Sequence, residues 1–217
     1  MFPELLSAQE MLTMLLQASI CKFMLGTRAV GVTKPFCDSI HKTLGDQGAK
    51  LLEAYGITPD LSDADGLCKI LRFSTDISFF APSNTFAKGW PGKSYVYRFN
   101  EPNPWDGEWK GEAGHVLDVA YLFQNYNEFM DSASKNVAVR FAGDFIKFMN
   151  GKSVWEPFGT KEGAQVYGPS GKGVCSEYVE GVASEKSGRR NTVYELAEDI
   201  KLDVLGGAWS AFFTGGG

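Results

Sequence analysis

The 217-residue chain has very little histidine and no excess of positive charge. It contains two histidines, His41 and His115, and its 21 Lys and Arg are outnumbered by 26 Asp and Glu, which gives a net charge of −5. Nucleic-acid binding depends mainly on Lys and Arg that neutralise phosphates. The composition therefore gives no support for a nucleic-acid partner.

Cysteine is also sparse, and its spacing argues against a metal centre. The four cysteines are Cys21, Cys37, Cys68 and Cys175, and no two of them form a Cys-x-x-Cys pair. Structural zinc sites usually need such closely spaced ligands. We expect no metal and no cofactor. The even number would permit disulfides, but without a secretion signal we favour buried thiols.

Long hydrophobic runs are absent. No segment reaches the ~18 apolar residues expected of a membrane-spanning helix. The first 24 residues are partly apolar, but they lack a basic start and are interrupted by Glu4 and Glu10. We interpret this segment as structural rather than as a signal peptide, which favours a cytoplasmic location.

The chain is rich in aromatic residues, with 16 Phe, 8 Tyr and 5 Trp. Hydrophobic residues make up 44% and charged residues 22%, as in an ordinary globular protein. Many aromatic rings in such a chain indicate a bulky core or a roomy apolar site.

The residue pattern predicts mostly helices with a few strands. Ser62 is a candidate N-cap with Asp65 three residues later, and Pro82 either interrupts a helix or begins the next one. Apolar periodicity predicts helices over 8–24, 35–57 with breaks near Gly45 and Gly48, parts of 62–90, 127–151, and 192–213 with a glycine break. Alternation of strand-forming residues predicts a strand over 94–100, and a short strand and turn fall at 164–171.

A long loop separates the 94–100 strand from His115. It reads "NEPNPWDGEWKGEAG" and ends directly before the histidine and an apolar run. Long structured loops in compact domains often carry function. Trp105 and Trp109 in this loop either line a pocket for an acyl or alcohol group or simply pack.

Four segments in a fixed order resemble the type B carboxylesterase/lipase family. They are "STDISFFAPSNTFA", "GKSYVYRFNEPNP", "GEAGHVLDVAYLF" and "FAGDFIKFMNGKSVWEPF", and they cover roughly residues 60–170. This family is the cholinesterase-like branch of the α/β-hydrolases, and in detail the chain looks most like divergent fungal members. The resemblance implies an α/β fold class: the C-terminal portion of an α/β-hydrolase, mostly helices with a few strands from the edge of the sheet.

The resemblance also implies a Ser-His-acid mechanism acting on a small carboxylic ester. His115 occupies the position of the family's catalytic histidine. Glu10 lies 105 positions earlier, after the end of an expected strand, and matches the position of the acid, although the glycine that usually follows the acid is absent. Asp118 matches the family's acidic residue behind the histidine and would at most orient the loop. His41 lies on a polar helix face, so we interpret it as structural or solvent-exposed.

The chain lacks the nucleophile that this chemistry needs. No Gly-x-Ser-x-Gly is present, and in "GPSGKG" (168–173) Lys172 stands where the last glycine belongs. That segment also follows the histidine, against the superfamily order of serine, acid, histidine. We interpret it as a turn. Residues 1–217 are then expected to form a single partial domain that lacks the nucleophile half and is inactive alone.

Three hypotheses remain open. In the first, the chain belongs to an esterase, as a fragment, as an incomplete gene prediction or as one part of a two-part enzyme. In the second, it is a non-catalytic hydrolase-like interaction module. In the third, it is an unrelated helical domain. In the first two, the remaining strands would leave an uncovered sheet edge. The sequence leaves open whether a second copy of the chain, a complementing chain or nothing covers that edge.

Overall fold

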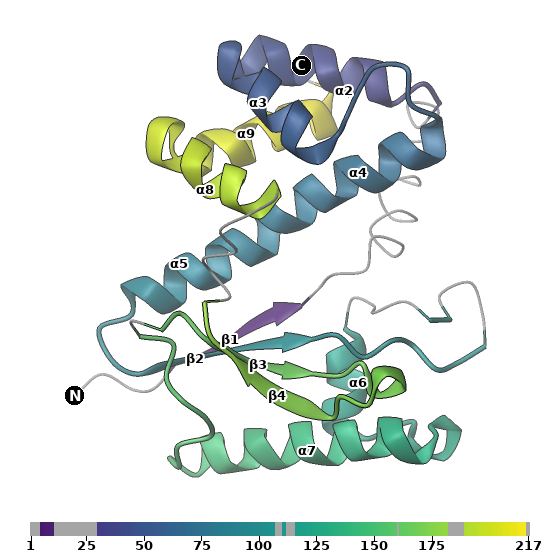
Figure 1. Ribbon diagram of the computed structural model, residues 1–217, viewed down its shortest axis with the longest axis vertical. Coiled ribbons are helices and arrows are strands. Elements are labelled where there is room, and N and C mark those ends of the chain that lie inside the picture. Colours follow the sequence, from purple (N-terminus) through teal and green to yellow (C-terminus); the bar gives the residue numbers. More distant parts are fainter. Residues whose placement is uncertain are drawn as a thin grey trace. The chain divides into compact units, whose positions relative to one another are not determined.

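The computed structural model describes residues 5–10, 30–106, 110–111, 116–159, 161–181 and 189–215. The chain divides into two compact units, each built from two separate segments. The first unit comprises residues 1–13 and 82–184, and the second comprises 14–81 and 185–217. Figure 1 labels the elements of each unit.

The first unit is built on a small sheet. Among the described residues the sheet has four strands in the order β1-β2-β3-β4; β1, β2 and β3 are mutually parallel, and β4 is antiparallel to β3. Its elements are β1 (Leu5–Glu10), α5 (Ala81–Gly89, which begins at the unit boundary), β2 (Ser94–Phe99), α6 (Leu117–Phe123), η3 (Asn127–Phe129), α7 (Ser132–Met149), β3 (Ala164–Tyr167), η4 (Ser170–Lys172) and β4 (Ser176–Val179).

Strand β2 is buried along its whole length because both of its faces are covered. On one face, the rings of Tyr97 and Phe99 contact Phe141 of α7, with centroids 5.1 and 5.4 Å apart. On the other face, Val96 packs in a cluster with Ala87 of α5. Figure 1 shows α7 running across one side of the sheet. Parallel strands in α/β proteins are typically covered in this way.

Helix α7 confirms most of the helix predicted over 127–151. The Asp131 side chain accepts a hydrogen bond from the backbone N–H of Ser134 at 2.8 Å, which caps the helix N-terminus. Val137 and Phe141 face the sheet and are buried. The chain before the cap forms the short 3-10 helix η3 instead of continuing α7.

The second unit is helical. Gly45 and Gly56 follow two of its helices with φ of 55° and 59°, a backbone conformation that glycine adopts readily. The predicted break near Gly45 is confirmed, whereas the break expected near Gly48 is wrong, because Gly48 is buried inside a continuous helix. The Ser62 hydroxyl accepts from the Asp65 N–H at 3.1 Å, which confirms the predicted N-cap. The elements of this second unit are α2 (Thr33–Leu44), α3 (Asp46–Tyr55), α4 (Asp63–Thr75), the π-helical turn η2 (Asp76–Phe80), α8 (Arg189–Ile200) and α9 (Leu202–Thr214).

A buried ion pair ties the two chain segments of this unit together. Arg190 Nε lies 3.0 Å from Asp76 Oδ1, and the two side chains are 9% and 0% exposed. The Tyr55 hydroxyl donates to Asp76 Oδ2 at 3.0 Å, and the Arg190 guanidinium lies over the Phe80 ring. Residues 114 positions apart are thus held in one polar cluster surrounded by apolar core.

Several sequence-based expectations need correction. Residues 8–10 belong to β1, so the helix expected over 8–24 does not begin at residue 8; residues 11–24 lie outside the described residues. The C-terminal helix breaks at Lys201, with φ of 69°, whereas Gly206 and Gly207 continue α9. Strand β4 was not anticipated. The unrelated helical domain is excluded, because residues 94–99 form a strand paired on both sides.

The described cysteines differ in their exposure to solvent. Cys37 is buried, whereas Cys68 and Cys175 are partly exposed; Cys21 lies outside the described residues. Burial raises the pKa of the Cys37 thiol above its ordinary value. In the part of the chain that the structure describes, no helix is long and apolar enough to cross a membrane.

The buried pair gives a stability prediction. Arg190→Met leaves the fully buried Asp76 carboxylate without its guanidinium, which we expect to lower the free energy of unfolding by about 3–5 kcal/mol. Urea denaturation followed by circular dichroism measures this. Lys34→Met is the control, because Lys34 and Asp38 form a surface pair with side chains 69% and 65% exposed. Equal shifts of the urea midpoint in both variants would contradict the assignment.

Candidate functional site

The carboxyl ends of β1 and β2 lie side by side. Glu10, the last residue of β1, is in register with Phe99, the last residue of β2, and the two strands run parallel. Parallel strands of α/β proteins deliver their following loops to the same sheet edge, where ligand sites form. The backbone of Glu10 and the start of the loop that leads to His115 therefore share one edge of the sheet. His115 itself lies outside the described residues, so its role stays a prediction.

The chain just after His115 is anchored to β2 through Asp118. The Tyr97 hydroxyl donates to Asp118 Oδ2 at 3.0 Å, and the Val119 N–H donates to Asp118 Oδ1 at 2.8 Å. Asp118 is 5% exposed. Val116 precedes α6 with φ of 59°, a conformation that costs energy for a β-branched residue. The first turn of α6 is thus fixed on the buried strand.

The chain just after β2 is anchored by a second carboxylate, Glu101, which sequence reasoning missed. Glu101 is 0% exposed. Its Oε1 accepts from the Ser134 hydroxyl at 2.9 Å, and its Oε2 accepts from the Ser170 N–H at 2.6 Å. The Ser170 hydroxyl also donates to Oε1. Gly168 has φ of 73° and passes so close to Glu101 that a Cβ atom would not fit.

These contacts define the Glu101 clamp, formed by Glu101, Ser134 and Ser170. It joins the end of β2, the first turn of α7 and the β3–β4 connection. These contacts also give the segment "GPSGKG" a structural role. It contains the 3-10 helix η4, which confirms the predicted turn, and its Ser170 binds Glu101. Buried carboxylates require such donors to offset lost hydration. No local signal could reveal the clamp, because its serines lie 33 and 69 residues from Glu101.

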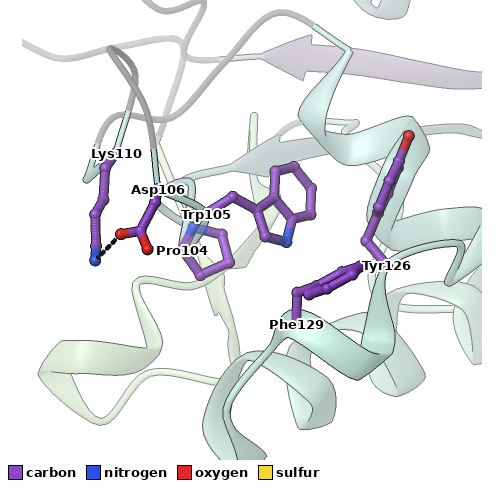
Figure 2. Close-up of a pocket in the computed structure, with 6 residues that line it drawn as sticks. All are labelled: Pro104, Trp105, Asp106, Lys110, Tyr126 and Phe129. Atoms are coloured by element: carbon purple, nitrogen blue, oxygen red, sulfur yellow. Dashed lines mark hydrogen bonds and ion pairs between the residues drawn. The ribbon is translucent and has the colours of Figure 1, made fainter.

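An open aromatic slot lies on the same loop (Figure 2). Its volume is about 640 Å³, within the ordinary range for small-molecule sites. The Trp105 and Tyr126 rings contact one another with centroids 5.0 Å apart, and Trp105 also approaches the buried Tyr121 at 6.5 Å. The slot is lined by Pro104, Trp105, Asp106, Lys110, Tyr126 and Phe129.

The slot is connected to the sheet through Tyr121. This side chain is fully buried, and its ring contacts Phe99 at the end of β2, with centroids 5.1 Å apart. Burial raises the pKa of the Tyr121 phenol well above its usual range, so the hydroxyl is neutral at physiological pH. Of the two tryptophans proposed for a pocket, Trp105 lines the slot, and Trp109 lies outside the described residues.

Two further sequence-based expectations concern His41 and a metal site. His41 lies on the exposed face of α2, as predicted. No group of three or more His, Cys, Asp or Glu arranged to hold a metal ion occurs among the described residues.

Comparison with known proteins identifies the fold of the chain. A solved structure titled "PNB esterase" matches with a TM-score of 0.52 and 16% sequence identity. The match covers 70% of this chain and 31% of the esterase chain, so this chain spans less than a third of that protein. No protein-family model matches, and no curated protein matches significantly. The chain therefore has a partial α/β-hydrolase, esterase-like fold, mostly helical with a small sheet, as the sequence predicted.

The Glu101 clamp gives a local prediction. Glu101→Gln keeps the shape of the side chain but turns one oxygen into an NH₂ group that faces donors from Ser134 or Ser170. Losing about 1 kcal/mol of local stability should speed trypsin cleavage after Lys110 roughly fivefold. Mass spectrometry of timed digests measures the rate. Glu128→Gln is the control, because Glu128 is exposed. An equal change of the cleavage rate in both variants would rule out the Glu101 clamp as an anchor for the start of this loop.

Proposed function

We propose that this chain supplies the histidine and acid side of a serine carboxylic ester hydrolase of the type B carboxylesterase/lipase family, resembling divergent fungal members. The observation that supports this most directly is the parallel pairing of β1 with β2, with Glu10 in register with Phe99. In α/β-hydrolases the acid and the histidine follow neighbouring strands, and β2 is the strand that leads to His115. The esterase-like fold agrees with this assignment.

In the proposed reaction, each residue has a defined role. His115 takes the proton of the attacking serine as general base and later returns it to the leaving alcohol as general acid. Glu10 orients the imidazole and stabilises its protonated form. The chemistry runs on side chains alone, so the proposal needs no cofactor. The substrate is a small carboxylic ester, and the aromatic slot on the same loop is the proposed place for part of it.

The nucleophile must come from polypeptide beyond these 217 residues, which contain no Gly-x-Ser-x-Gly. We propose that residues 1–217 form one partial hydrolase domain, the C-terminal portion of the fold. Strand β1 pairs only with β2 among the described residues, which leaves its other edge for a further strand. That strand would come from the nucleophile portion or, less favourably for catalysis, from a second copy of this chain.

A non-catalytic interaction module is the second candidate. Helix α6 exposes Val119 and Phe123, 39% and 66% accessible, on the face opposite its buried one, and Val116 just before the helix is 51% exposed. A helix that is apolar on both faces is usually covered by protein. An in-frame Gly-x-Ser-x-Gly upstream in the gene favours the esterase, and its absence favours the module.

The isolated chain is expected to show no esterase activity. Hydrolysis of p-nitrophenyl esters should equal that of a His115→Ala variant, and no serine should react with a fluorophosphonate probe, because the nucleophile is missing. If the upstream gene supplies Gly-x-Ser-x-Gly, the joined polypeptide should be active and lose roughly 10³-fold or more on His115→Ala. Robust turnover by the 217 residues alone would overturn the proposal.

The acid assignment can be tested without turnover. A carboxylate beside an imidazole favours its protonated form, so Glu10→Gln should lower the pKa of His115 by about one pH unit or more. Only two imidazoles are present, so NMR titration separates them readily, with His41 as internal reference. Glu4→Gln is the matched control. An unchanged His115 titration in Glu10→Gln would refute Glu10 as the acid while leaving the histidine assignment standing.

A further inference from the structure

The aromatic slot has walls that suit one class of ligand. Its sides are the rings of Trp105, Tyr126 and Phe129, of which Tyr126 and Phe129 are 47% and 63% exposed. Figure 2 shows Trp105, Tyr126 and Phe129 grouped around one part of the slot, with Asp106 and Lys110 on the left of the view. Large aromatic side chains rarely stay this accessible together unless they contact a ligand or a partner.

The charged residues of the slot cancel one another. Lys110 Nζ lies 2.6 Å from Asp106 Oδ1, with side chains 58% and 93% exposed. The hydrogen bond from Lys110 and its positive charge lower the pKa of the Asp106 carboxyl below its ordinary value. Because these two charges are paired, the described lining residues carry no net charge that would attract an ionic ligand.

The ring geometry also disfavours a compact cation. Cation recognition by aromatic cages needs ring faces that converge on a space wide enough for the ion. Here the Trp105 and Tyr126 rings touch, with centroids 5.0 Å apart and planes inclined by 55°, so no ion fits between them. What remains accessible is a wall of ring surface, on which a flat group can stack.

We propose that this slot binds a flat, neutral aromatic group through stacking on Trp105, Tyr126 and Phe129. That the ester substrate carries such a group rests on the proposed function. That the slot binds such a group depends only on the slot, whether or not the chain takes part in catalysis.

The test uses the full chain and non-hydrolysable probes. Ligand-observed NMR measures the affinity of acetanilide, N-cyclohexylacetamide and tetramethylammonium, which represent a flat aromatic, a non-planar analogue of the same size and a compact cation. A fragment of this size should bind with a Kd on the order of millimolar. We expect acetanilide to bind at least roughly fivefold more tightly than either other probe.

Two substitutions locate the site. Phe129→Ala should weaken acetanilide binding roughly fivefold, because one wall of the slot is lost. Phe123→Ala should leave it unchanged, since Phe123 is similarly exposed, at 66%, but does not line the slot. Binding of the cyclohexyl amide or the cation as tightly as acetanilide, equal loss in both variants, or no acetanilide binding up to about 10 mM would each overturn the proposal. Because no turnover is measured, these outcomes are independent of the esterase assays.

Discussion

The first unit depends on a single strand that is buried on both faces. Every residue of β2 is buried, with α7 on one side and α5 on the other, and β2 pairs with β1 and β3 along its edges. A central parallel strand has no freedom to slip, because a shift by one residue would exchange its two faces. The aromatic residues Tyr97 and Phe99 would then lose their contacts with Phe141. This fixed strand sets the position at which the chain leaves the sheet toward Glu101.

The loop after β2 is held at both ends by buried carboxylates. Glu101 binds donors from α7 and from the β3–β4 connection, whereas Asp118 accepts from Tyr97 of β2. Both anchors are buried polar groups whose hydrogen bonds become costly to break once water is excluded. Anchoring both ends of a long loop limits the positions open to the residues it carries. This is the arrangement that a preorganised site on a loop requires.

Local patterns in the sequence predicted the parts of the fold that are decided locally. The strand at 94–99, helix α7, the Ser62 cap and the break near Gly45 each depend on neighbouring residues, and each is confirmed. The break between α8 and α9 falls at Lys201 because packing outweighs the propensity of the Gly206–Gly207 pair. The Glu101 clamp and the slot walls join residues distant in sequence, so no window of the chain could reveal them. Glu10 and His115 rest on family order, and only the strand pairing beneath them is visible in the described residues.

Two features of the first unit are left uncovered by the described residues, and a further polypeptide segment could cover both under either proposed function. Strand β1 has one neighbour among the described residues, although parallel strands are stable mainly inside a sheet. Helix α6 is apolar on both faces, with Leu117 and Tyr121 buried while Phe123 is exposed. Any polypeptide segment that completes the sheet could cover both the edge of β1 and the exposed face of α6, so covering alone does not separate an esterase from an interaction module. The difference lies in chemistry: an esterase needs the covering chain to bring a serine to the carboxyl edge that Glu10 and the β2 loop share, whereas a module needs only the surface. The proposed catalysis would therefore fix the orientation of the added strand, since only a strand that ends at that edge can place a nucleophile there.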